Sequence, residues 1–136
     1  MAAQARDATD LVFVYGLLKR GFSLHHHMSL GVFVGDATVR GALYSLGQYP
    51  GLVEGTGSVH GELYRFADIA VALEVLDEVE LYDPLDPDGS EYLRVIRQAR
   101  LDASGESVAT WCYVYNKPIA TGSPIKSGAW IEARTT

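Results

Sequence analysis

Apolar residues form an unbroken run from Leu11 to Tyr15, and Gly16 ends it. A short run rich in β-branched and aromatic residues predicts a buried strand. Gly16 then predicts a tight loop, because glycine permits positive φ and close backbone approach. In such a loop the amides of Leu17 and Leu18 need not join a ladder, and successive free N–H groups suit a carboxylate or phosphate. An ordinary turn after a strand is the alternative interpretation of the same residues.

Period-two alternation and β-prone composition predict four further strands, at residues 37–44, 58–66, 92–101 and 107–115. Gly41 suggests a bulge or bend within the first of these. Residues 45–57 are rich in glycine and contain Pro50-Gly51, which predicts a loop that walls a pocket. Residues 102–106 predict a hairpin turn, and residues 116–136 an irregular tail pinned by Ile125 and Trp130. Five strands with mostly short antiparallel connections and one helix predict an α+β fold whose sheet curls or closes.

The helix is predicted from Ile69 to about Leu81, with Asp68 as its N-cap. At 100° per residue an apolar stripe forms on one face, and Glu74 and Glu78 point away from it. The stripe consists of Ile69, Leu73 and Leu76, with Ala72 and Val79 at its edge.

Glu80 falls within this apolar stripe, four residues after Leu76. If the helix persists to residue 80, it directs a carboxylate inward, where desolvation raises the pKa toward the range useful for proton transfer. Pro84 disfavours helical geometry just beyond, so the alternative is a helix that ends earlier and leaves Glu80 as an acid at the rim.

Composition limits the class of protein. A chain of 136 residues, 48% hydrophobic and 21% charged, fits one globular domain, which we expect at residues 11–136 after a disordered tail at residues 1–10. The net charge of −6 argues against nucleic acid as a partner. A single cysteine, Cys112, and the lack of a signal peptide or membrane-length apolar run predict a soluble, cytoplasmic protein.

Several other residues invite a functional interpretation. His25, His26 and His27 are adjacent, so at most two share a face, and we expect surface or structural histidines rather than a metal site. The acidic segment 82–92 has the wrong ligand spacing for calcium and is interpreted as a solvated loop. Arg94 is either a substrate clamp or a surface strand residue. Tyr92, Tyr113 and Tyr115 either line a pocket or belong to the core.

An ordered set of motifs resembles the gamma-glutamylcyclotransferase-like family, nearest its gamma-glutamylamine cyclotransferase branch. The motifs span roughly residues 11–130. They are Phe13-Val-Tyr-Gly-Leu-Leu-Lys-Arg-Gly21 with His25-His26, Gly41-Ala-Leu-Tyr44, Tyr49-Pro-Gly-Leu52, Gly61-Glu-Leu-Tyr64, Leu76-Asp-Glu-Val-Glu80, Tyr92-Leu-Arg94 and Ser127-Gly-Ala-Trp130.

This resemblance implies a small mixed β-barrel with flanking helices and an enzyme, of acyltransferase or lyase type, that releases 5-oxoproline from gamma-glutamyl compounds, linked to glutathione-related metabolism. It implies Glu80 as the acid/base residue and no metal or organic cofactor. The predicted substrate-binding residues are Tyr15, Gly16, Leu17, Leu18, Tyr92 and Tyr115. The predicted partner is a small gamma-glutamyl molecule, without indication of the leaving amine or the oligomeric state.

Three leucines depart from the family pattern. Leu17 stands where a small hydroxyl residue is common, Leu24 where Asn often precedes the histidines, and Leu81 where Gly usually follows the glutamate. Two other functions therefore stay open: a binding module of the same fold without turnover, and an interaction domain in which Glu80 titrates as an exposed carboxylate.

Overall fold

The computed structural model describes residues 9–119 and 122–131. The elements in chain order are β1 (Leu11–Val14), the 3-10 helix η1 (His25–Met28), β2 (Gly31–Ser45), β3 (Pro50–Phe66), α2 (Ile69–Val79), β4 (Tyr92–Leu101), β5 (Ser107–Tyr115) and β6 (Ser123–Pro124).

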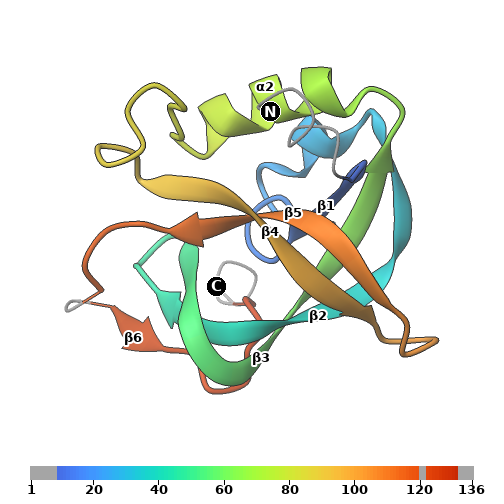
Figure 1. Cartoon of the computed structure of the whole chain (residues 1–136). Helices are drawn as coiled ribbons and strands as arrows, with labels where there is room; N and C mark the ends of the chain where they lie inside the picture. Colours follow the sequence, from blue (N-terminus) through green and yellow to red (C-terminus); the bar gives the residue numbers. More distant parts are fainter. Residues whose placement is uncertain (1–8, 120–121, 132–136) are drawn as a thin grey trace.

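Five strands form a closed barrel in the order β3, β1, β5, β4 and β2, and pairing of β2 with β3 closes the circle (Figure 1). β1 and β5 run parallel, while the other four pairings are antiparallel. β6 extends the sheet by pairing with the end of β2. The predicted α+β fold with a small mixed barrel is thus confirmed.

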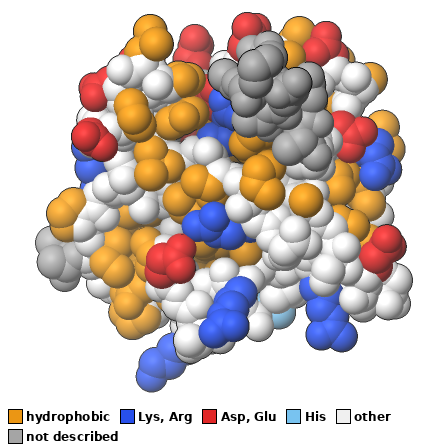
Figure 2. All heavy atoms as spheres, viewed as in Figure 1, with side chains coloured by type: hydrophobic (Ala, Val, Ile, Leu, Met, Phe, Trp, Pro, Cys, Tyr) orange, Lys and Arg blue, Asp and Glu red, His pale blue; other side chains and the backbone are white. Residues whose placement is uncertain are grey.

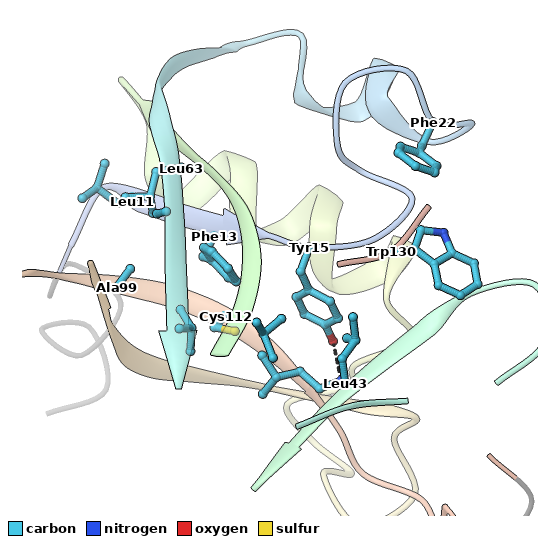
Figure 3. Packing of buried hydrophobic residues seen from close by; sticks show 13 residues of the cluster. Leu11, Phe13, Tyr15, Phe22, Leu43, Leu63, Ala99, Cys112 and Trp130 are labelled. Atoms are coloured by element: carbon cyan, nitrogen blue, oxygen red, sulfur yellow. Dashed lines mark hydrogen bonds between the residues drawn. The ribbon is translucent and has the colours of Figure 1, made fainter. Parts of the chain in front are cut away.

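Two apolar cores explain why β1 lacks polar positions. Leu11, Phe13 and Tyr15 face the barrel interior, where they pack with side chains of the other strands (Figure 3). Val12 and Val14 face outward and pack beneath α2. Because alternate side chains of a strand point to opposite faces, a strand covered on both sides must be apolar throughout.

The helix α2 lies across the top of the barrel in Figure 1 and covers the second core. Its predicted N-cap is confirmed, since the Asp68 carboxylate accepts a hydrogen bond from the Val71 amide at 3.2 Å. The predicted apolar stripe of Ile69, Leu73 and Leu76 is buried, and Glu74 and Glu78 are exposed.

The predicted loop at residues 45–57 is wrong. β3 starts at Pro50, so only residues 46–49 connect it to β2, and the strand pairs with β2 along almost its whole length. Pro50 is tolerated because it occupies the first position of the strand, where a missing N–H costs little. The predicted irregularity at Gly41 is confirmed as a register shift between Arg40 and Ala42.

The ends of the described chain are attached to the barrel. The Thr9 hydroxyl donates to the Ala109 carbonyl at 2.8 Å, and the Phe66 amide donates to the Asp10 carbonyl at 3.0 Å. The first eight residues of the predicted N-terminal tail lie outside the described residues. Near the other end, Trp130 is fully buried and Ile125 packs against the barrel core, as predicted.

The face viewed in Figure 2 carries acidic and basic side chains interspersed with apolar ones. None of the helices described is long and apolar enough to cross a membrane.

Candidate active site

A pocket of about 180 Å³ lies where the end of β1, the C-terminal end of α2 and the beginnings of β3 and β4 meet. Its lining is mainly apolar, with two carboxylates. The lining residues are Phe13, Val14, Tyr15, Gly16, Leu17, Leu18, Leu24, Tyr49, Pro50, Val79, Glu80, Leu81, Glu91, Tyr92 and Tyr113. The structure therefore brings together Glu80, the loop from Tyr15 to Leu18 and Tyr92, all predicted from the sequence.

Tyr15 is held rigidly at the floor of the pocket. Its hydroxyl donates to the Tyr113 carbonyl at 2.8 Å and accepts from the Leu52 amide at 3.1 Å, the bond drawn in Figure 3. Burial raises the pKa of Tyr15 well above its ordinary value. Since both hydrogen bonds go to backbone, this hydroxyl ties three strands together beneath the site.

Gly16 is required by close packing. A Cβ atom at this position would lie 2.8 Å from Cγ of Pro50, a distance that side chains do not tolerate. Its φ is outside the left-handed region, so the predicted permission for positive φ is not what this position uses. Instead the loop after β1 and the start of β3 touch here, which fixes one wall of the pocket.

Replacing Gly16 by alanine is expected to destabilise the protein by about 1–3 kcal/mol, the usual cost of forcing a methyl group into a packed site. Chemical denaturation of the variant measures this. Gly35→Ala is the matched control, because its added Cβ meets only the end of the Leu101 side chain, at 3.2 Å. Equal stabilities for the two variants would contradict the role assigned to the Gly16–Pro50 contact.

The loop after β1 lines the pocket and contains two unpaired amides. Within the described residues, the backbone N–H groups of Leu17 and Leu18 have no hydrogen-bond acceptor. Carbonyls of the same loop are engaged, since the Leu24 amide donates to Leu17 at 3.0 Å and Nδ1 of His25 donates to Leu18 at 2.9 Å. The loop is thus held through its carbonyls, while two of its amides join no ladder; binding of an anionic group to them stays a prediction.

Glu62 anchors this loop from outside the pocket. Its buried carboxylate accepts from the Arg20 backbone amide at 3.1 Å, from Nε of Arg20 at 3.2 Å and from the Tyr64 hydroxyl at 2.9 Å. Arg20 therefore ties the end of the loop to Glu62, and it is not among the pocket-lining residues described.

Glu80 is the C-cap of α2, one residue beyond the last helical residue, Val79. Its amide still donates to the Leu76 carbonyl at 2.9 Å, so the inward direction of the apolar stripe is kept. Desolvation by burial, followed by the charge of Glu91, raises the pKa of Glu80 from 4.5 to about 7. The half-buried Glu80 side chain lines the pocket, as the inward interpretation expects, although the helix ends at Val79 and is shorter than predicted.

Leu81 turns the chain sharply after Glu80. Its φ of 54° makes it the one described residue other than glycine with positive φ. The Leu81 amide donates to Glu78 at 3.3 Å and the Tyr82 amide to Asp77 at 2.8 Å, the two bonds of a Schellman motif. Leucine thus occupies the position that glycine usually fills, at a conformational cost of about 1–2 kcal/mol.

Glu91 is a second pocket carboxylate that sequence analysis missed, because it lies in a segment interpreted as a solvated loop. Hydrogen bonds within residues 82–91 order this loop, including one from the Asp83 amide to the Ser90 hydroxyl at 2.9 Å. The Tyr49 hydroxyl donates to Glu91 at 2.6 Å. The only sequence signal was its position directly before the strand that begins at Tyr92.

The three tyrosines predicted as pocket or core have different places. Tyr92 and Tyr113 line the pocket, and the Tyr92 hydroxyl donates to the Pro50 carbonyl at 2.7 Å. Tyr115 is not among the lining residues described; its ring packs edge-on against Tyr92, with centroids 5.3 Å apart.

Arg94 is not among the pocket-lining residues described, and its largely buried side chain differs from the surface strand residue of one interpretation. It forms a bidentate ion pair with Asp77 of α2, at 2.8 and 3.1 Å, and both side chains are largely buried. The Tyr113 hydroxyl donates to the same carboxylate at 2.7 Å. This network joins α2 to β4 and β5 three residues before Glu80.

The histidines form the 3-10 helix η1 beside the loop. His25 supports the loop through Leu18, and the rings of His26 and His27 pack against each other with centroids 4.1 Å apart. Among the residues described, no group of three or more His, Cys, Asp or Glu side chains is arranged to hold a metal ion.

The protein is thus a small mixed β-barrel in which the loop after β1 shares a pocket with a carboxylate at the end of α2. Residues 12–132 match the family Gamma-glutamyl cyclotransferase, AIG2-like. The chain belongs to this family.

Individual relatives agree with this assignment. The chain is 37% identical over 122 residues to the Gamma-glutamylcyclotransferase family protein YtfP of Escherichia coli (strain K12), which covers 89% of this chain and 96% of that protein. The solution structure of Escherichia coli YtfP superimposes with a TM-score of 0.59 at 36% identity, over 90% and 97% of the two chains. An AIG2-like protein from Mus musculus shares the fold, with a TM-score of 0.70 at 23% identity over 93% and 91% of the chains.

Proposed function

We propose that this protein releases 5-oxoproline from a gamma-glutamyl amine or amide, with Glu80 as the acid/base residue. The observation that carries the proposal is the pairing, in one apolar pocket, of a desolvated glutamate with a rigid loop of unpaired amides. The first group suits proton transfer near neutral pH, and the second suits an anion.

In the proposed complex, the substrate's α-carboxylate accepts hydrogen bonds from the amides of Leu17 and Leu18. Tyr15 and Gly16 shape the loop that presents these amides, and Tyr92 forms part of the wall. Tyr115 acts through Tyr92, against which it packs. The rigid pocket supplies orientation, which is the main requirement for closing a five-membered ring.

The reaction needs no nucleophile from the protein. Glu80 takes a proton from the substrate's α-ammonium group, and the freed amine attacks the γ-carbonyl carbon to form the ring C–N bond. Glu80 then gives this proton to the departing nitrogen as the old C–N bond breaks. After the attack the ring nitrogen carries one proton more than a lactam nitrogen, and it passes this proton to the re-ionised Glu80 and from there to the released amine. The products are therefore 5-oxoproline and the amine in its ammonium form. This chemistry uses no metal or organic cofactor.

Mass-spectrometric detection of 5-oxoproline tests the proposal. The protein is incubated with a panel of gamma-glutamyl amino acids and gamma-glutamyl amines, and product above a no-protein control is the expected result. The amine released fastest identifies the preferred substrate. If the folded protein forms no product but is thermally stabilised by a panel member, the binding-module function replaces this one. Leu17, Leu24 and Leu81, which all line the pocket, are then the first residues to revert to the family pattern.

The rate should depend on pH through Glu80. As a base Glu80 must be ionised, so kcat/KM is expected to rise about tenfold per pH unit below pH 7 and to level off above it, following its pKa of about 7. Burial raises the pKa of four other ionisable groups that interact with the Glu80 charge, so these groups stay neutral over this pH range. They are Tyr15, Tyr92, Tyr113 and Cys112.

Initial rates measured between about pH 5 and 9 check this expectation. The substrate's own α-ammonium group also ionises, at more alkaline pH. This second ionisation affects the rate in the same way for the wild type and for every variant. A rate that levels off already near pH 5 would show that Glu80 titrates as an ordinary carboxylate and would exclude it as the base.

A further inference from the structure

Glu91 is fixed in the pocket by its backbone on both sides. Its amide donates to the Leu81 carbonyl at 3.1 Å, and its carbonyl accepts from the Asn116 amide at 2.8 Å. Leu81 is the residue whose positive φ turns the chain after Glu80. Its carbonyl thus holds the backbone of the residue that carries the second carboxylate.

The Glu91 side chain keeps one oxygen available. Oε2 accepts the Tyr49 hydroxyl at 2.6 Å, and Oε1 has no hydrogen-bond donor among the residues described. The side chain is only half-buried and forms part of the pocket wall. A carboxylate held in this way can accept further hydrogen bonds from a ligand.

The pocket lining described carries negative charge without positive charge, which favours a cationic ligand group at Glu91. No lysine or arginine side chain is among the lining residues described, so the two carboxylates have no cationic partner within the pocket. A carboxylate in an apolar setting is costly unless it is paired. A ligand cation removes this cost, and the gamma-glutamyl head group carries one cation, its α-ammonium group.

We propose that Glu91 binds the α-ammonium group of the substrate and thereby determines specificity for a free α-amine. The proposal rests on the proposed function. Two of the three ammonium N–H groups are then accounted for: one donates to Oε1 of Glu91, and another faces Glu80, which takes its proton. With the α-carboxylate on the loop amides, the head group is held at both charges and the nitrogen is oriented toward the γ-carbonyl carbon.

Tyr49 is a positioning residue in this arrangement, since it acts through Glu91. It belongs to the short connection between β2 and β3 and immediately precedes Pro50, which packs on Gly16. Its hydrogen bond to Glu91 raises its pKa to about 12, so the hydroxyl keeps its proton and remains a donor. Glu91 is consequently oriented by the wall that also carries the anion-binding loop.

Binding of two matched ligands tests the role of Glu91 without turnover. The ligands are gamma-glutamylpropylamide and N-propylglutaramic acid, which differ only by the α-amine, and binding is measured by calorimetry at about pH 7. Both are measured in Glu80→Gln and in the double variant Glu80→Gln/Glu91→Gln. Glu80→Gln/Glu54→Gln is the control, because Glu54 is exposed and lies outside the pocket lining described.

In Glu80→Gln we expect the ligand with the α-amine to bind about 10- to 100-fold more tightly, the factor for one hydrogen bond between charged groups. The added Glu91→Gln change should bring this ratio close to one while affinity for N-propylglutaramic acid stays within about twofold. The Glu54 control should keep the full ratio. Tyr49→Phe in the Glu80→Gln background should reduce the ratio only partly, and it serves as the second variant if the double variant does not fold.

A ratio unchanged by both Glu91→Gln and Tyr49→Phe would overturn the role of Glu91, even if wild-type protein forms 5-oxoproline. A ratio that disappears with Glu91 while wild-type protein forms no product would support the inference and reject the proposed reaction. Equal affinity for the two ligands in Glu80→Gln itself would overturn the inference outright.

Discussion

Replacing Glu80 by glutamine is expected to lower the rate of 5-oxoproline formation by about 10²–10⁴-fold, the usual contribution of a general acid/base. Glutamine keeps the size and shape of the side chain but cannot accept or return a proton. The same change is expected to stabilise the folded protein at alkaline pH, because it removes a charge from a desolvated position.

The sign of the stability effect follows from the pKa of Glu80, which burial raises from 4.5 to about 7. The folded state therefore binds the proton more tightly than the unfolded state. Protonated Glu80 therefore adds to the free energy of unfolding of the wild type. This contribution is complete below about pH 4.5 and is lost as the pH rises through 7. Glutamine does not titrate, so above pH 8 the free energy of unfolding of Glu80→Gln should exceed that of the wild type by on the order of 3 kcal/mol.

Urea denaturation at about pH 4 and pH 8.5 measures this difference, alongside product formation by mass spectrometry. Glu78→Gln is the control, since Glu78 lies two residues away on the exposed face of α2 and should change neither quantity. A Glu80→Gln variant that is inactive and no more stable than wild type at alkaline pH would mean that Glu80 is solvated in the folded protein. Retained activity would exclude Glu80 as the acid/base residue.

Replacing Asp77 by alanine is expected to destabilise the protein by about 3–5 kcal/mol, because it leaves a buried guanidinium without its partner. Asp77 accepts two hydrogen bonds from Arg94 and one from the Tyr113 hydroxyl. The side chains of Asp77 and Arg94 are each only 12% exposed, so water does not replace the lost bonds. The Arg94 guanidinium also stacks over the Trp111 ring, 4.8 Å from its centroid, which restricts its escape to solvent.

The matched control is Glu54→Ala, which breaks the ion pair between Glu54 and Arg97. Glu54 is 91% exposed, so the expected loss is below about 1 kcal/mol. Chemical denaturation compares the two variants. If Asp77→Ala does not fold, Tyr113→Phe removes one of the three bonds and is expected to cost about 1–2 kcal/mol. Equal losses for Asp77→Ala and Glu54→Ala would show that the buried network contributes no more than a surface pair.

Asp77 and Glu80 lie in the last turns of one helix, which links the two predictions. Asp77 fixes the helix end to β4 and β5, and its carbonyl accepts the Tyr82 amide that closes the turn at Leu81. Glu80 lies within this turn. The helix end is thereby held at both sides of the carboxylate.

The local elements were predictable because each leaves a periodic trace in the sequence. The apolar run at β1, the alternation in β4 and β5, and the stripe of α2 report which faces are buried. The inward direction of Glu80 follows from the 3.6-residue period, and the N-cap Asp68 follows from its residue type at the helix start. The loop amides were predictable from the single glycine that ends β1.

The start of β3 was not predictable, because Pro50-Gly51 in a glycine-rich segment has the composition of a turn. Pairing of residues 50–53 with β2 overrides that local preference and extends the β2–β3 hairpin that closes the barrel. The same closure places Pro50 against Gly16 and Tyr49 beside Glu91.

The residues alone were thus enough to predict the family, the barrel with its covering helix, and a glutamate on the apolar face of that helix. The partners of single side chains became visible only in the folded structure: Glu91 joins Glu80 in the pocket, Arg94 pairs with Asp77, and the Tyr15 hydroxyl bonds to backbone groups. This division arises because sequence periodicity reports on which face of an element a side chain lies. Its partner there comes from a distant segment, and the closing of the barrel brings the two together.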